Sequence, residues 1–536
     1  MAQLESNTTP LSGSSILQRS TTFSREIGLL PAISFAINSI GLALGGILPF
    51  AVFAGLFPGV DLLQIVLVAV ATSLIFGTIY SSIGGLLPFN GADYVLTSRI
   101  FGGAVGFATS FSAVVLLAFS AGAIISMLPK LVLPGLLVGF GLIQGSTVGE
   151  LGASVSQTGT AVIISTVLVV LAFGLAIVPR RYIRWVLGIG TGLTLVAWVW
   201  MTVTLVGVTG SQFPPAGDAG MGLDNFVTQI EAAGEAGMPL YQDPLLGIFA
   251  GGSLSLWLLY GSFSLVNMSG EMKKPGRDLP ISHLVSVLLA GGFMLATTYL
   301  LREMILPAWF SAESFLFLQG GETQAMPWIF FYTAIFNDTP AFLMFLILVW
   351  ILGFINLLQT IFYYASRIIW AWGKDHVFPE GLSFVHRQWR SPLVATLLFA
   401  ILVQVGVIVA MQIPRLFLSR AYVLPWMVLL ILPLVAIIVA AFKKPKWFVK
   451  ASGIAGWRIG RFPFLSLFAL IAIAYLGASI YFLAFGRLGI LLLTGGEVWL
   501  VIGLFLIGLV WYAGRRAWLG RSQIELNDSF KTLPPE

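Results

Sequence analysis

Twelve apolar segments dominate this sequence, and they limit the folds that the chain can adopt. Each is about 20 residues long or longer, the length that an α-helix needs to cross the hydrocarbon core of a bilayer. Only 9% of the 536 residues are charged, against about 25% in a typical soluble domain. The sequence therefore predicts an all-α membrane protein with 12 transmembrane helices. The predicted spans are 27–56, 61–87, 103–128, 156–178, 183–208, 245–270, 281–306, 339–372, 391–412, 417–442, 464–486 and 497–518.

A further apolar segment, 131–149, contains Pro134 and several glycines that weaken it as a helix. Counting it as a span would reverse the orientation of every later helix. We therefore assign it to an outer loop with a short helix.

The distribution of basic residues sets the orientation, because Lys and Arg are enriched in cytoplasmic loops. With the N-terminus inside, 23 of the 28 basic residues fall on the inner side, and the longest outer loop, 209–244, is acidic. The sequence thus predicts a multi-pass plasma-membrane protein with both termini cytoplasmic, including polar tails at 1–24 and 521–536. The inner basic clusters suit anionic lipid rather than nucleic acid. The outer side keeps Lys130, Arg302, Arg415, Arg420 and Arg487.

Two of the predicted spans carry small residues in their middle. The first contains Gly41, Gly45 and Gly46, and the sixth contains Gly261 and Ser262. Glycine inside a helix costs about 1 kcal/mol relative to alanine, and broken backbone at membrane depth survives only inside the protein or along a cavity. Two interrupted segments at corresponding positions of two halves indicate the binding site of a transporter.

Three loops on the predicted inner side carry long motifs. The first has Pro88, Gly91, Tyr94, Arg99 and Gly102; the second has Gly270, Glu271, Pro275, Arg277 and Pro280; the third has Arg367, Ala371, Asp375, Pro379, Arg387, Ser391 and Pro392. In these motifs the chain resembles the amino acid permeases of the amino acid–polyamine–organocation (APC) superfamily, over about residues 25–520. The resemblance implies a leucine-transporter-like fold, in which helices 1–5 (about 27–208) and 6–10 (about 245–442) form a 5+5 inverted repeat. Helices 1 and 6 would be broken, and helices 11 and 12 (about 464–518) would be added outside the repeats.

The resemblance also implies a substrate site at the two breaks, because freed backbone N–H groups attract anions and freed carbonyls attract cations. A substrate carboxylate would bind the amides of Gly45, Gly46 and Ile47. The ammonium would meet carbonyls of Ala43, Trp257 and Tyr260, beside Gly261. The third helix would line the pocket with Leu116, Leu117 and Ser120. Since this pocket holds no acid, we expect a neutral, small or hydrophobic amino acid as substrate.

The sequence leaves alternatives open for the gating residues and for the coupling ion. Trp257 suits a gate or a lipid-facing position, and Arg99, Glu271, Arg367 and Asp375 suit either an inner gate of ion pairs or a solvated loop. Proton-coupled relatives carry a lysine in the fifth helix, where this chain has Thr191 and Thr194, so coupling through such a lysine is not expected. Sodium could bind helix 1 carbonyls and the Thr360 hydroxyl, although Thr360 suits plain helix packing better than a cation site. Proton coupling by another route and uncoupled exchange stay open.

A permease of this kind needs no cofactor, and we expect none. The chain has no cysteine, and its three histidines (His283, His376 and His386), which we place on the inner side, have no metal-site spacing. We therefore expect no metal site and no catalytic site. The alternatives to an amino acid permease are a non-transporting receptor or scaffold on the same fold, and a transporter of another small organic amine.

Overall fold

The computed structural model describes residues 23, 25–137, 148–208, 223–241, 243–320, 327–337, 339–386, 388–413, 423–460, 462–482, 496–520 and 526–534. Several residues used above lie outside these ranges. They include nearly all of the predicted N-terminal tail, part of the predicted C-terminal tail, much of the predicted acidic loop, and Arg387, Arg415, Arg420 and Arg487.

Each predicted span coincides with helical structure. Among the described residues, ten helices are long and apolar enough to cross a membrane, and a bent pair at the start of the chain makes an eleventh. The last match, α22 (Phe464–Ile480), has 17 residues and is shorter. The count of twelve therefore stays a prediction. The other long helices are α5 (Leu62–Leu86), α7 (Gly103–Met127), α10 (Thr158–Ile177), α11 (Arg180–Val208), α15 (Pro275–Met304), α18 (Pro340–Lys374), α19 (Leu393–Gln412), α20 (Val423–Lys443) and α23 (Gly496–Gly520).

The first predicted span is broken, as expected. Helix α2 (Leu29–Ile40) ends at Gly41, whose φ of 68° lies in the left-handed region that glycine adopts at little cost. The chain continues as α3 (Leu42–Gly45), a π-helical turn η1 (Leu48–Phe53) and α4 (Ala54–Leu56). The two parts are bent by 43°.

The sixth predicted span is irregular rather than sharply broken, so the predicted break at Gly261 and Ser262 is wrong in position. These residues lie inside α14 (Gly261–Ser264). The span begins with α13 (Pro244–Leu254), which is followed by a π-helical turn, η3 (Ser255–Leu259). After α14 come two 3-10 turns, η4 (Leu265–Asn267) and η5 (Ser269–Glu271). Leu245–Asn267 still forms one 23-residue span. The glycine serves close packing, as described below, rather than unwinding.

The third span is longer than predicted. Helix α7 continues through a π-helical turn, η2 (Leu128–Val132), so that the span runs from Gly103 to Leu137. Pro129 and Pro134 do not end it, because a π turn accommodates the missing N–H at Pro129. The assignment of 131–149 to an outer loop with a short helix is therefore wrong for residues 131–137, which continue the third span, while 138–147 lie outside the described residues.

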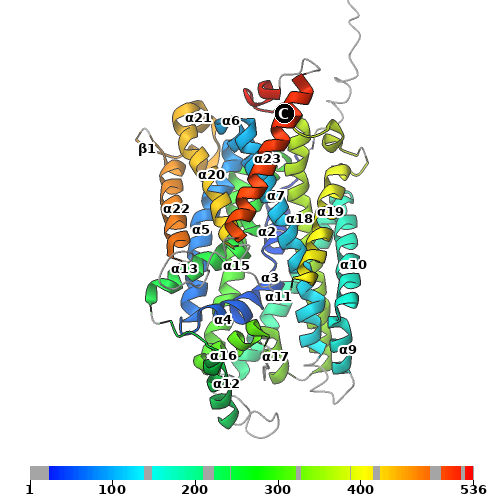
Figure 1. The fold of residues 1–536 in the computed structure, drawn as a ribbon, viewed down its shortest axis with the longest axis vertical. Helices are drawn as coiled ribbons and strands as arrows, with labels where there is room; N and C mark the ends of the chain where they lie inside the picture. The colour runs from blue at the N-terminus through cyan, green and yellow to red at the C-terminus, as the bar shows by residue number, and fades with distance from the viewer. Residues whose placement is uncertain are drawn as a thin grey trace, which may run out of the picture.

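The two ends of the bundle carry different short elements (Figure 1). At one end lie α12 (Leu223–Glu235), α16 (Pro307–Gln319) and α17 (Ile329–Phe336), in stretches that the sequence assigned to outer loops. The opposite end, which the charge map predicts to be cytoplasmic, carries the following elements: α6 (Ala92–Phe101), α21 (Pro445–Lys450), η9 (Gly453–Gly456), and the antiparallel pair β1 (Arg458–Ile459) and β2 (Phe462–Pro463). The remaining short helices are α9 (Val148–Ser156), η6 (Glu380–Ser383) and η11 (Leu526–Phe530).

Helix α2 lies inside the bundle. It packs against α15, α11, α18 and α14, so its neighbours come from both predicted repeats. Helices α5 and α15 pack along each other, as do α7 and α19. The break in the first span is therefore enclosed by helices on several sides.

Candidate functional site

The irregular parts of the first and sixth spans touch each other through their backbones. A Cβ atom added at Gly261 would lie 1.8 Å from the carbonyl oxygen of Ser39. Real side chains do not approach backbone so closely, so glycine is required at this crossing. The two segments that the sequence singled out for a binding site are thus in direct contact.

The amides assigned to a substrate carboxylate are engaged within the first span. The Gly45 N–H donates to Gly41 O at 3.3 Å, and the Ile47 N–H donates to Leu44 O at 3.0 Å. The Gly46 N–H also donates to Leu44 O. A ligand could take these donors only after this turn opens.

Large apolar side chains enclose the same turn. A Cβ at Gly46 would meet Ile329 at 2.8 Å and Trp350 at 3.3 Å, and one at Gly45 would meet Met294 at 3.3 Å. Ala43 packs against Gly353 of α18. The carbonyl of Gly46 accepts the N–H of Ile329 at 3.1 Å, which ties the break to α17. Sequence analysis assigned no role to Ile329, although the apolar run at 329–336 indicates a helix there.

Trp257 and Tyr260 lie on the same irregular stretch of the sixth span, and both are half-buried. The ring of Trp257 lies 6.0 Å from that of Phe53, so this side chain packs against the second part of the first span. The ring of Tyr260 lies 4.9 Å from that of Trp426 on α20. The two side chains thus contact different helices.

The three residues of α7 that were predicted to line the pocket are buried. No described contact joins them to Gly45, Gly46 or Gly261. Helix α7 packs mainly against α19 and α23. Leu116, Leu117 and Ser120 line none of the cavities described below. The Ser120 hydroxyl is buried without a hydrogen-bond partner among the described residues.

A cluster of neutral polar side chains occupies the junction of α2, α11 and α18. The Asn38 amide donates to Thr191 Oγ1 at 2.8 Å and to Leu187 O at 3.1 Å. The Asn356 amide, next to Gly190, is fully buried, and neither end has a hydrogen-bond partner among the described residues. The sequence identified Thr191 but missed Asn38 and Asn356, which could have been found as polar residues inside apolar spans.

Thr360 behaves as a helix-packing residue in this conformation. It is fully buried on α18, and its hydroxyl donates to Leu357 O of the same helix at 2.7 Å. Its oxygen keeps free lone pairs, because a hydroxyl can donate one hydrogen bond and still accept.

A buried ion pair joins the end of the sixth span to α18. Arg367 Nε lies 2.8 Å from Glu271 Oε1, and both side chains are fully buried. The hydroxyl of Tyr363 donates to the other carboxylate oxygen at 3.0 Å, and the guanidinium of Arg367 stacks on the Tyr363 ring, 3.5 Å from its centroid. These two residues are not part of a solvated loop.

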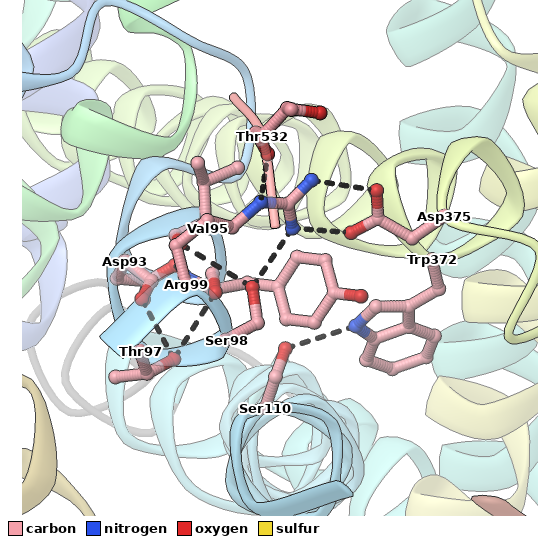
Figure 2. Close-up of polar contacts among 10 residues, drawn as sticks. Asp93, Val95, Thr97, Ser98, Arg99, Ser110, Trp372, Asp375 and Thr532 are labelled. Atoms are coloured by element: carbon pink, nitrogen blue, oxygen red, sulfur yellow. Dashed lines mark hydrogen bonds and ion pairs between the residues drawn. The ribbon is translucent and has the colours of Figure 1, made fainter. Parts of the chain in front are cut away.

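A second ion pair joins α6 to the end of α18 (Figure 2). Arg99 donates to both oxygens of Asp375, with Nη2 and Oδ1 separated by 2.7 Å, and both side chains are largely buried. The Nε of Arg99 donates to Thr532 O at 3.3 Å, and its guanidinium lies 5.3 Å from the centroid of the Phe530 ring. The segment around η11 therefore packs on this ion pair.

His283 lies in α15 and is fully buried inside the bundle. Its ring lies over Gly77 of α5, where a Cβ would clash with it, and its Nε2 lies 3.0 Å from Ser73 O. Its Nδ1 lies 2.8 Å from the Ser262 hydroxyl. The imidazole thus connects α5 and α15 to α14.

Several cavities in the described part of the chain lie near these elements. One of about 310 Å³ lies between α4, α16 and the ends of α5 and α15 that face them. A second of about 230 Å³ lies between α2, α11 and the end of the sixth span, lined in part by Phe35, Arg184 and Tyr363. A third of about 30 Å³ lies between α5, α6, α7 and α20. In the part of the chain that the structure describes, no three metal-binding side chains come together.

Comparison with known proteins gives a family. A search of curated proteins finds no match. The family model described as "Amino acid permease" matches residues 27–510, which is most of the chain. Together with the apolar helices, this match identifies a multi-pass membrane protein of a transporter family. The chain belongs to the amino acid permeases of the APC superfamily.

Proposed function

We propose that this permease is a secondary active transporter that moves a neutral, small or hydrophobic amino acid across the plasma membrane by alternating access. The observation that carries the proposal is the contact between Gly261 and the Ser39 carbonyl. It joins two irregular helices at the point where a zwitterion can bind opposite ends of backbone dipoles.

The side chains around the turn at Gly45 and Gly46 support a neutral substrate. Met294, Ile329 and Trp350 approach Gly45 and Gly46, and none of them carries a charge. A cationic side chain would find no counter-ion among these three side chains. We infer that substrate binding opens the turn at Gly41–Ile47 and replaces its internal hydrogen bonds with bonds to the carboxylate.

Contacts on either side of the break suit gates. The Gly46–Ile329 hydrogen bond ties the first span to α17 at one end. The Glu271–Arg367 and Arg99–Asp375 ion pairs tie the sixth span and α6 to α18 at the predicted cytoplasmic end. Alternating access would break these contacts in turn.

The polar cluster at Asn38, Thr191 and Asn356 supports a hard cation as a coupling ion, because its side chains offer neutral oxygen ligands. Sodium is the cation to test first. Thr360 stands on the same helix as Asn356, one turn away.

Counterflow in proteoliposomes tests the function. Vesicles loaded with one unlabelled neutral amino acid should take up the labelled form faster than vesicles loaded with lysine or glutamate. A thermal-shift screen against the twenty amino acids, with and without sodium, identifies the substrate, because a ligand stabilises the state that binds it. An absence of counterflow with every amino acid and small amine would contradict transport and favour a non-transporting receptor or scaffold on the same fold.

A further inference from the structure

Asp93 stands in the first turn of α6, between the membrane-spanning helices α5 and α7. Its Oδ1 accepts the N–H of Tyr94 at 2.7 Å, and its Oδ2 lies 3.4 Å from Nδ2 of Asn267 at the end of the sixth span. It forms no ion pair with any described residue. In this it differs from Glu271 and Asp375, which are both paired with arginines.

The carboxyl of Asp93 lines the cavity of about 30 Å³, which has room for one or two water molecules. The titratable side chains around it are Tyr80 from α5, Tyr260 from the sixth span and Tyr94 from α6. Helix α7 contributes Thr109 and Ser110, and α20 contributes Trp426, Leu429, Leu430 and Pro433, none of which titrates. Arg99, the basic residue of α6, is bonded to Asp375.

This environment changes the acidity of the group. Burial raises the pKa of Asp93 from 3.8 to about 6, and the hydrogen bonds from Tyr94 and Asn267 only partly oppose the rise. The group therefore titrates within the range of cellular pH.

Asp93 also lies in a seam that holds the end of the sixth span to α6. The Gly91 N–H donates to Asn267 O at 2.9 Å, and the Ser269 hydroxyl donates to Phe89 O at 2.7 Å. The side-chain oxygen of Asn267 is buried without a hydrogen-bond partner among the described residues. A protonated Asp93 could donate to that oxygen after a rotation of the amide, so the seam can satisfy both charge states.

We propose that Asp93 is a proton-binding site of this permease, and that protonation from the cytoplasm holds the end of the sixth span against α6 and slows transport. The inference rests on the proposed function, because its consequence is a change in transport rate. It is independent of which ion drives transport.

The sign follows from linkage. Asp93 is partly exposed even while the seam is closed. When the seam opens, more water reaches its carboxyl and its pKa returns toward 3.8, so the closed seam binds the proton more tightly. Acid therefore favours the closed seam, and the effect disappears above the closed-state pKa of about 6. These two values give about a fourfold shift toward the closed state when internal pH falls from 7.5 to 5.5.

Counterflow at fixed external pH and varied internal pH tests the inference. In the wild type, the initial rate should fall about fourfold between internal pH 7.5 and 5.5. Asp93→Asn, which mimics the protonated acid, should show a low rate with no such dependence. The matched control is Glu380→Gln, an exposed carboxyl at the same end, which should keep the wild-type profile.

The outcomes separate the two proposals. An absence of counterflow at every pH contradicts the proposed function. Counterflow that is independent of internal pH in the wild type, or equally dependent on it in Asp93→Asn, overturns the proton site. If Asp93→Asn does not fold, infrared difference spectra of the wild type and Asp93→Glu decide. A protonated-carboxyl band that appears between pH 7.5 and 5 and shifts in Asp93→Glu supports the site, and a band that is unchanged in Asp93→Glu overturns it.

Discussion

Gly261 approaches Ser39 so closely that a Cβ at position 261 would lie 1.8 Å from the Ser39 carbonyl oxygen and 2.3 Å from its carbonyl carbon. Both neighbouring atoms belong to backbone, so neither can rotate away as a side chain would. The first and sixth spans can therefore cross here only while residue 261 lacks a side chain.

Gly261→Ala should separate the two spans. We expect a loss of stability of about 1–3 kcal/mol, typical of overpacking, together with loss of the stabilisation that a substrate gives. Thermal unfolding in detergent with and without substrate measures both. The matched control is Gly292→Ala in α15, where an added Cβ meets nothing within 4 Å; it should be neutral or slightly stabilising.

Glu271→Gln should strongly destabilise the protein. The substitution keeps the shape of the side chain but leaves the fully buried Arg367 without its counter-charge, and breaking a buried ion pair on one side costs about 3–5 kcal/mol. Denaturant unfolding measures this cost. Arg302→Gln breaks the half-exposed pair with Asp61 and should cost at most about 1 kcal/mol; equal effects of the two substitutions would contradict the structural role of the buried pair.

His283→Gln should destabilise the contact between α5, α14 and α15. The imidazole reaches Ser73 O and the Ser262 hydroxyl at the same time, and a buried group left unsatisfied costs about 1–3 kcal/mol. His376→Gln, at a partly exposed position, should stay within about 0.5 kcal/mol of the wild type. Thermal unfolding of the two variants compares them, and a neutral His283→Gln would show that glutamine can replace both contacts.

Phe530→Ala should release the segment around η11 rather than unfold the bundle. The Phe530 ring is buried against Gly103 and lies under the Arg99 guanidinium. The cost is limited by the free energy that docks this segment, so global stability should change little. Hydrogen exchange should rise in 526–534 and at the start of α7. Lys531→Ala, at an exposed site, serves as the control and should leave that exchange low.

Hydropathy predicted the positions of the helices because membrane spans are set mainly by length and apolarity. It could not predict how a helix bends. The glycines at 41–46 produce a bend, since Gly41 adopts a positive φ, whereas Gly261 lies inside a helical turn and serves packing. Sequence alone does not distinguish these two uses of glycine.

The candidate site was predicted in outline for a similar reason. The sequence selected the two irregular spans and the motif residues Glu271, Arg367, Arg99 and Asp375, but their pairing depends on helices that lie far apart in the chain. It missed Asn38, Asn356 and Ile329, and it named His283 without predicting its contacts. Each of these residues contacts a residue of another helix, and a local sequence pattern cannot predict which residue that is.

The hydrogen bond from Arg99 to Thr532 joins residues 433 positions apart. Helix α6 is synthesised early, while its partner in this contact leaves the ribosome only after every described transmembrane helix has been made. During biosynthesis, the hydrogen bond from Arg99 to Thr532 therefore cannot form until most of the protein has been inserted. This corner of the predicted cytoplasmic end is therefore completed only after the described transmembrane helices have been synthesised.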